Sequence, residues 1–208
     1  MFYFIKTPWW LQRLYSNCIW HIPSTEKVIY LTFDDGPDPV ATTFVLDVLK
    51  KYDAKATFFC IGQNVLEQPS VYERIVNEGH AVGNHTFNHL NGWKTSDDMY
   101  MENIAEAKKY IHSQLFRPPY GKATKFQLKL ISGVRHKFKT IMWTVLSGDF
   151  DEKVTEKQCL KNVLNKTGKG SIVVFHDSKK AYKKIQFTLP KVLEYFHDKG
   201  YHFERIST

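Results

Sequence analysis

Two adjacent carboxylates follow a short apolar run near the start of the chain. The segment is Thr-Phe-Asp-Asp-Gly-Pro, in which the acids are Asp34 and Asp35. Neighbouring side chains that leave a strand point in different directions, so one carboxylate can bind a metal ion while the other accepts a proton. The same residues also suit a solvated turn.

A second group of candidate ligands is the histidine pair His85 and His89. Two imidazoles four residues apart can converge on one ion if the segment turns helically, although surface helices carry such pairs without a metal. With one carboxylate they would leave coordination positions open for water and substrate. A divalent ion in such a site lowers the pKa of water and polarises a carbonyl, so the set predicts hydrolysis.

Three further segments carry polar or rigid residues. Arg117 precedes two prolines and Tyr120, and the prolines fix the direction of the Arg117 side chain and the Tyr120 N–H. An ordinary proline-rich turn is the alternative. Asp149 ends a segment that begins at Trp143, and His176 follows an apolar run. A single histidine at a strand end is often structural.

The elements that must position these residues are short β-rich runs that alternate with segments of helical periodicity. This alternation predicts β/α units and a parallel sheet. The predicted strands are Val28–Phe33, Ala56–Ile61, Thr140–Thr144 and Ser171–Phe175, and the predicted helices are Thr43–Tyr52, Ser70–Glu78, Ser96–Leu115, Glu156–Asn165 and Leu189–Asp198. Such units close into a barrel or form an open doubly wound sheet, with active residues at the carboxyl ends of the strands.

Length and composition are those of one ordinary domain. The chain has 208 residues, of which 43% are hydrophobic, and no linker-like tract divides it. Its net charge of +8 comes from scattered lysines, with the densest cluster at residues 179–184 in a predicted loop. This pattern does not predict nucleic-acid binding. Three widely spaced cysteines indicate neither a disulfide framework nor a cysteine metal site.

The first residues indicate neither a signal peptide nor a transmembrane span, because Lys6 and Pro8 interrupt a short apolar run. A cytoplasmic location is therefore favoured, with the periplasm or cell envelope as the alternative. The aromatic stretch Phe2–Trp20 can either plug one end of the core or lie on a membrane surface. We favour the plug, and the sequence does not indicate an oligomeric state.

Taken together and in this order, the five segments resemble the polysaccharide deacetylase family, also called the NodB homology domain or carbohydrate esterase family 4. The resemblance runs from about Glu26 to Tyr201. It implies an α/β fold, an irregular (β/α) barrel that is a deformed TIM-like barrel with about seven parallel strands. Residues 26–208 would form the catalytic domain, and residues 1–25 an aromatic segment packed on the barrel.

The resemblance also implies a role for each candidate residue. Asp34 would be the general base, oriented by Arg117, and His176 the general acid, oriented by Asp149. The metal ligands would be Asp35, His85 and His89; the Tyr120 N–H would face the oxyanion, and Trp143 would line the substrate pocket. Zinc suits two imidazoles and a carboxylate, with cobalt, nickel or manganese as alternatives.

The implied reaction is removal of N-acetyl groups from an N-acetylglucosamine-containing glycan, such as peptidoglycan or a chitooligosaccharide. One alternative is an O-acetyl esterase on xylan or a related polysaccharide, and another is a noncatalytic carbohydrate-binding relative. Two positions depart from the family pattern: Phe150 stands where a tryptophan is common, and Leu146 where many relatives have an acid. Both changes concern the substrate pocket.

Overall fold

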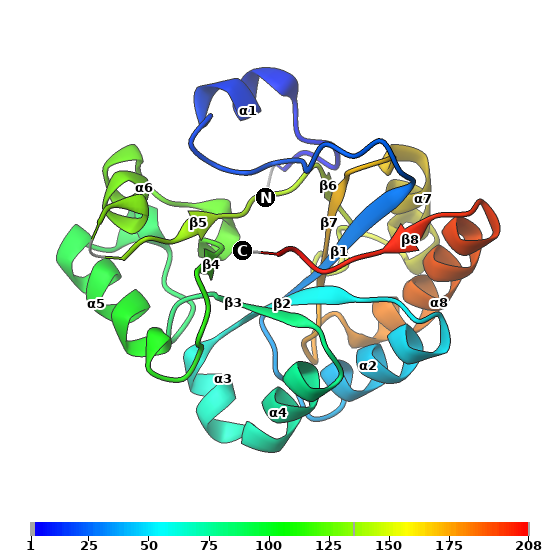
Figure 1. Cartoon of the computed structure of the whole chain (residues 1–208), viewed down its shortest axis with the longest axis horizontal. Helices are drawn as coiled ribbons and strands as arrows, with labels where there is room; N and C mark the ends of the chain where they lie inside the picture. The colour runs from blue at the N-terminus through cyan, green and yellow to red at the C-terminus, as the bar shows by residue number, and fades with distance from the viewer. Residues whose placement is uncertain (1–2, 135, 208) are drawn as a thin grey trace.

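Parallel strands form one curled sheet in the computed structural model, which describes residues 3–134 and 136–207 (Figure 1). The order across the sheet is β5-β4-β3-β2-β1-β7-β6, and β8 pairs with β1 beside this path. The strands are β1 (Val28–Asp34), β2 (Ala56–Cys60), β3 (Ala81–Asn84), β4 (Leu115–Phe116), β5 (Lys139–Thr140), β6 (Val145–Leu146), β7 (Ile172–His176) and β8 (His202–Phe203). The predicted irregular barrel of about seven parallel strands is confirmed.

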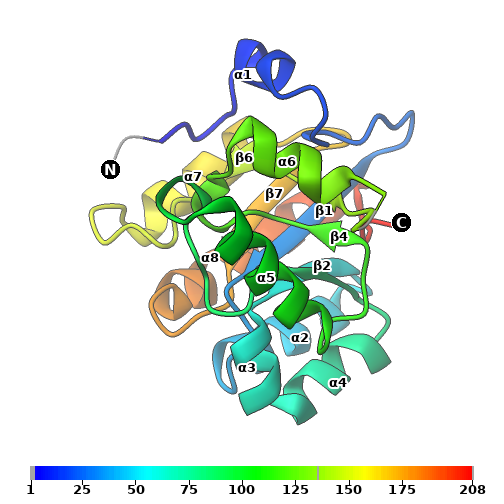
Figure 2. The same cartoon turned by 90° about the vertical axis from the view of Figure 1, so that its left-hand side faces the viewer.

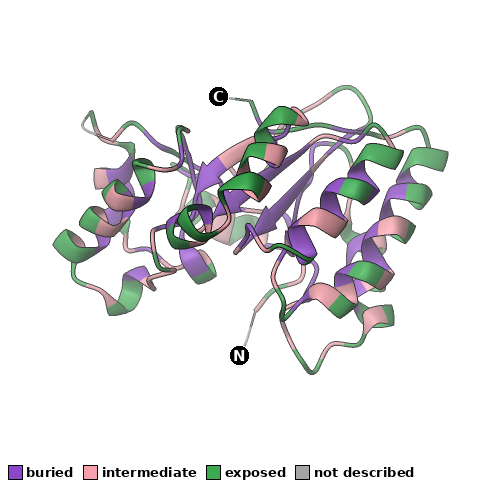
Figure 3. Ribbon diagram, turned by 90° about the horizontal axis from the view of Figure 1, so that it is seen from below, coloured by how far each residue is buried: buried purple, intermediate pink, exposed green. Residues whose placement is uncertain are grey.

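Helices cover the outer face of this sheet, except for the first helix, which lies in the segment before β1 and has no buried residue. They are α1 (Trp9–Leu14), α2 (Ala41–Lys51), α3 (Gly62–Glu67), α4 (Pro69–Asn77), α5 (Asp97–Lys108), α6 (Lys125–Ser132), α7 (Glu156–Lys166) and α8 (Tyr182–Asp198). Helices α5 and α6 lie side by side (Figure 2), and they contact β3 and β5, respectively. Seen from below, the buried surface of the helices faces the strands and the exposed surface faces outward (Figure 3).

Strand β1 is buried on both faces, and its two faces have different tasks. Ile29, Leu31 and Phe33 pack in the main hydrophobic cluster against α2 and α8. Because side chains alternate along a strand, Thr32 and Asp34 point to the opposite face, inside the curl of the sheet. There Thr32 and Asp34 both accept hydrogen bonds from a buried arginine. The core thus holds the strand while its other face carries polar groups.

Three predicted elements differ from the structure. The helix predicted to reach Leu115 ends at Lys108, because Leu115 pairs with β5 as part of β4. The single strand predicted at Thr140–Thr144 is replaced by two short strands, β5 and β6, at opposite ends of the sheet. Helix α8 begins at Tyr182, so part of the lysine cluster predicted to lie in a loop is helical. It is longer than predicted because Ile185 packs in the core.

The N-terminal segment, residues 3–22, contacts both ends of the open sheet. The Leu146 N–H of β6 donates to the Ile5 carbonyl, and the Ile19 N–H donates to the Thr140 carbonyl of β5. Trp20 is buried, whereas Trp9 is 73% exposed and Trp10 is 49% exposed. The segment therefore spans the gap between β5 and β6 while part of its aromatic surface faces solvent. In the described residues, no helix is both long and apolar enough to cross a membrane.

Candidate active site

The predicted site residues meet at the carboxyl ends of the central strands. Asp34 ends β1, His176 ends β7, and the two are register partners across this strand pair. His85 follows β3, and Arg117 follows β4, where its N–H donates to the Asn84 carbonyl. Parallel strands place their carboxyl ends at one edge, so segments far apart in the sequence converge there. Asp34, His85 and His176 line a cleft of about 380 Å³, and Arg117 is buried behind it.

Asp35, His85 and His89 converge as a potential metal-binding set. One ligand atom from each lies within 4.8 Å of the others. Asp35 Oδ1 is 3.1 Å from His89 Nε2 and 3.6 Å from His85 Nε2. The predicted three ligands are therefore adjacent in space.

The environment of His85 leaves one ring nitrogen free to act as a ligand. His85 Nδ1 lies 2.7 Å from the Arg117 carbonyl oxygen, which can only accept, so the proton sits on Nδ1 and the lone pair on Nε2. Burial lowers the pKa of His85 to about 4. A neutral imidazole whose Nε2 faces Asp35 is the form that binds a cation.

Two further observations indicate that Asp35 and the two histidines suit a divalent ion. Asp35 Oδ1 is a buried oxygen without a hydrogen-bond partner in the described residues, which is costly for a carboxylate unless a cation lies nearby. Burial by itself would raise the pKa of Asp35, but the neighbouring imidazoles, above all His89, hold it below its usual range. An ionised carboxylate beside two imidazoles is a donor set typical of zinc sites.

The segment that carries both histidines does not turn helically, yet the two imidazoles still converge. Residues 85–89 form an irregular loop in which Thr86 has φ 65° and His89 has φ 61°. Such left-handed backbone is uncommon for residues other than glycine and needs support from the surroundings. Asn103 Oδ1 provides some of it by accepting from the N–H groups of Phe87 and Asn88, at 2.9 and 3.3 Å.

Arg117 is fully buried and holds Asp34 in place. Its Nη1 donates to Asp34 Oδ1 and to Thr32 Oγ1, both at 2.7 Å. Nε and Nη2 donate to the carbonyls of Ile141 and Met142, each at 3.1 Å. Burial lowers the pKa of Arg117, and Asp34 opposes this shift. A buried guanidinium with these partners fixes one carboxylate oxygen and leaves Asp34 on the wall of the cleft.

Asp149 orients His176 through two contacts. Asp149 Oδ1 lies 2.7 Å from His176 Nδ1, and Asp149 Oδ2 accepts from the His176 backbone N–H at 2.7 Å. Because the carboxylate accepts from Nδ1–H, His176 Nε2 is left without this partner and can exchange a proton with a ligand in the cleft. Burial by itself would lower the pKa of His176, but the charge of Asp149 raises it to about 10.

Tyr120 and Trp143 form part of the cleft wall. Tyr120 has φ 60° and lies in a short turn after Pro119, and its hydroxyl is 3.2 Å from His89 Nδ1. Gly121 follows with φ 66°, and a Cβ there would come within 2.6 Å of the Trp143 ring. Both Leu146 and Phe150, where the sequence departs from the family pattern, also line the cleft.

Sequence reasoning assigned no role to several residues that hold the site together. Asp177 is fully buried; its Oδ1 accepts from the Gly36 N–H at 3.2 Å, and its other oxygen accepts from the Thr42 hydroxyl. Asn64 donates to the Asp35 carbonyl at 2.7 Å. Only the position of Asp177, next to His176 at a strand end, could have drawn attention to it. The contacts of Asn64 and Thr42 have no sequence signature.

Comparisons with known proteins agree with this geometry. A family model described as polysaccharide deacetylase matches residues 21–137, more than half of the chain. A Bacillus cereus protein named peptidoglycan-N-acetylglucosamine deacetylase is 35% identical over 194 residues, covering 90% of each chain. A chitooligosaccharide deacetylase of Azorhizobium caulinodans is 32% identical over 163 residues, covering 75% of this chain and 76% of that protein.

A solved structure also superposes over nearly the whole chain. It is a crystal structure of the Bc1960 peptidoglycan N-acetylglucosamine deacetylase, with a TM-score of 0.86, 31% identity, and coverage of 96% of this chain and 95% of that one. The family match, the identity over most of both chains and the shared fold agree. The chain therefore belongs to the polysaccharide deacetylase family and is a hydrolase of that family.

Proposed function

We propose that this protein removes N-acetyl groups from a glycan that contains N-acetylglucosamine. The observation that carries the proposal is the convergence of a three-ligand metal set, a carboxylate and an oriented imidazole on one cleft. Two similar proteins are named for deacetylation of peptidoglycan and of chitooligosaccharides, which supports an amide-linked acetyl group as the target.

Asp35, His85 and His89 would hold the ion, and zinc is the metal that best suits two imidazoles and a carboxylate. A divalent ion in this position supplies Lewis acidity to the acetyl carbonyl and lowers the pKa of water. Hydrogen-bond partners at Nδ1 would leave Nε2 of both ligand histidines available to the ion. His85 donates Nδ1–H to the Arg117 carbonyl, and His89 can donate Nδ1–H to the Tyr120 hydroxyl.

Proton transfer would be divided between the two groups at the ends of β1 and β7. Asp34 takes a proton from the attacking water, while Arg117 keeps its carboxylate oriented. His176 gives the proton on Nε2 to the leaving nitrogen as the carbon–nitrogen bond breaks, and Asp149 stabilises the protonated imidazole. The Tyr120 N–H would donate to the tetrahedral oxyanion. Acetate and a free amine are the products.

The test is acetate release from N-acetylglucosamine oligomers by protein stripped with a chelator and refilled with zinc or cobalt. Activity that disappears on stripping and returns on refilling supports the proposal. Acetylated xylan is assayed in parallel, because release from xylan alone would make the protein an O-acetyl esterase. Activity that survives both chelation and His85→Ala would contradict the metal site itself.

A further inference from the structure

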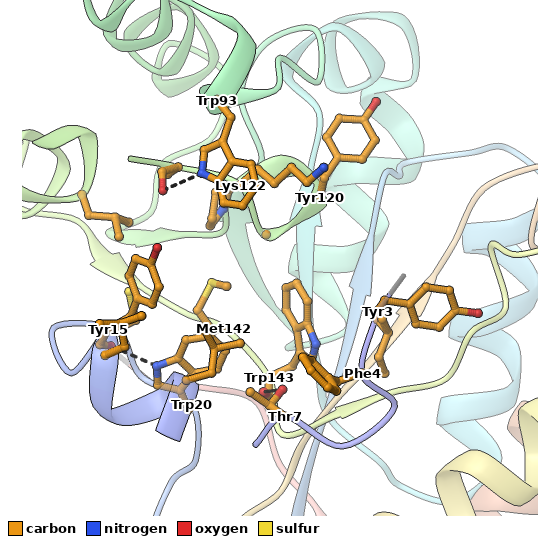
Figure 4. Close-up of a pocket in the computed structure, with 18 residues that line it drawn as sticks. Tyr3, Phe4, Thr7, Tyr15, Trp20, Trp93, Tyr120, Lys122, Met142 and Trp143 are labelled. Carbon is orange, nitrogen blue, oxygen red and sulfur yellow. Dashed lines mark hydrogen bonds between the residues drawn. The ribbon is translucent and has the colours of Figure 1, made fainter. Parts of the chain in front are cut away.

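A second cavity, of about 320 Å³, adjoins the catalytic cleft. The N-terminal segment forms one side of it, and residues 118–123 and 142–146 form the other (Figure 4). The two cavities share part of their lining, namely Tyr3, Tyr120, Gly121, Trp143 and Leu146. A ligand that occupies the cleft can therefore continue into the second cavity.

The polar groups in the lining of this second cavity are mostly engaged elsewhere. Trp93 Nε1 donates to the Ala123 carbonyl at 3.1 Å, and Trp20 Nε1 donates to the Tyr15 carbonyl at 3.0 Å, as the dashed lines in Figure 4 mark. The Thr7 hydroxyl donates to the Trp143 carbonyl at 2.8 Å. A sugar ring needs hydrogen-bond partners for its hydroxyls. Because these N–H and O–H groups already donate to backbone carbonyls, the residues offer mainly carbon atoms to a ligand.

Charge is also nearly absent from the cavity. No carboxylate is among the residues that line it in the described part of the chain. The ammonium of Lys122 lies 5.2 Å from the centre of the Trp93 ring, a cation–π distance. Met142, Leu128 and Cys18 supply buried apolar surface on the inner side. The cavity therefore favours a hydrocarbon group over a polar or charged one.

We propose that the second cavity binds a hydrocarbon chain attached to the N-acetylated sugar, so that the substrate class includes glycolipids as well as plain oligosaccharides. This inference rests on the proposed deacetylase function, because the sugar would occupy the catalytic cleft. The volume is that of a small-molecule site, and each methylene it buries strengthens binding. The N-terminal segment thus adds a specificity surface to the catalytic cleft.

The experiment uses the zinc-loaded protein and a series of alkyl N-acetylglucosaminides from methyl to dodecyl, each below its critical micelle concentration. We expect kcat/KM to rise roughly fourfold for each methylene that the cavity buries, and then to level off once it is full. A value that does not change with chain length overturns the proposal.

The variant Leu14→Asp locates the effect. Leu14 lines the cavity but is 51% exposed, so a charge there reaches the cavity with little disturbance of the core. The matched control is Val76→Asp, at a residue that is 47% exposed on α4, on the opposite side of the molecule from α1 (Figure 1). We expect Leu14→Asp to reduce the dodecyl-to-methyl ratio of kcat/KM about tenfold or more. Val76→Asp should leave the ratio unchanged.

Calorimetry measures the binding of methyl and octyl N-acetylglucosaminide to the wild type and to Leu14→Asp, and this readout does not need turnover. If no substrate is hydrolysed, the proposed function fails, and the binding data still decide the question of the second cavity. Tighter binding of the octyl than of the methyl compound, weakened by Leu14→Asp, supports the cavity proposal. Equal binding of the two compounds, or a chain-length effect that Leu14→Asp leaves intact, overturns it.

Discussion

Asp34 and His176 are register partners at the ends of neighbouring parallel strands, so their side chains emerge side by side into one cleft. The spacing between adjacent strands is about 4.8 Å, which places two proton-transfer groups on the same side of the sheet without help from a loop. Each has its own buried partner: Arg117 contacts Asp34, and Asp149 contacts His176. The sheet therefore sets the separation of the two groups, and the partners set their orientation.

Removing a proton-transfer group should separate turnover from metal binding. We expect Asp34→Asn and His176→Gln each to lower kcat by about 10²–10⁴, because each removes one acid or base. Zinc affinity, measured by competition with a chromogenic chelator, should change little in both. His85→Ala should lower zinc affinity and turnover together. Loss of zinc binding in His176→Gln to the same degree as in His85→Ala would contradict this division of roles.

Asp149→Asn should move the alkaline limb of the pH–rate profile. Asp149 raises the pKa of His176 to about 10, which keeps the imidazole protonated at neutral pH. The general acid works only below its pKa, so removing the carboxylate should shift the alkaline limb of kcat to lower pH. A bound cation would lower the pKa of His176 in both proteins, so the measurement is the difference between their profiles. Identical alkaline limbs would argue against His176 as the acid.

Asp177 should act on the metal site through the backbone of Gly36. Asp177→Ala leaves the Gly36 N–H and the Thr42 hydroxyl without their buried acceptor, at a cost of about 1–3 kcal/mol for each unsatisfied group. Since Gly36 follows Asp35, we also expect weaker zinc binding. Asp177→Asn keeps one acceptor and should therefore lose less stability and less zinc affinity than Asp177→Ala. Urea unfolding and zinc titration of the three proteins provide the test.

His80 should make stability depend on pH far from the catalytic cleft. Burial, aided by Lys55, lowers the pKa of His80 to about 4, and its Nδ1 accepts from the Ala56 N–H at 3.2 Å. The unfolded chain binds a proton near pH 6.5. The stabilising contribution of His80 is therefore complete above about pH 6.5 and is lost as the pH falls through about 4, and the total loss is about 3 kcal/mol.

Urea unfolding on both sides of this window measures the effect. His80→Asn keeps an acceptor near the Ala56 N–H and does not titrate, so its free energy of unfolding should fall less than that of the wild type as the pH is lowered. His202→Gln, at an exposed histidine, serves as the control and should follow the wild type. Parallel curves for all three proteins would show that His80 does not contribute.

Hydrophobic periodicity was sufficient to predict the long central elements. The helix predicted at Glu156–Asn165 is α7, and the strand predicted at Ser171–Phe175 is β7, each shifted by one residue at most. Short elements were lost because their periodicity covers too few residues. The two-residue strands β5 and β6 are defined by their partners, since nothing in the segment between Lys139 and Leu146 indicates that its halves pair at opposite ends of a sheet.

The sequence by itself determined which chemical groups are present and their order along the chain: two adjacent carboxylates, a histidine pair, an arginine before two prolines, and a strand-end histidine. Only the tertiary structure decided how His85 and His89 meet Asp35. The four-residue spacing would bring the imidazoles together in a helical turn, but a loop with left-handed backbone at His89 and with backbone N–H groups that donate to Asn103 does so instead. Left-handed backbone at such residues depends on distant partners, and local propensity does not encode those partners.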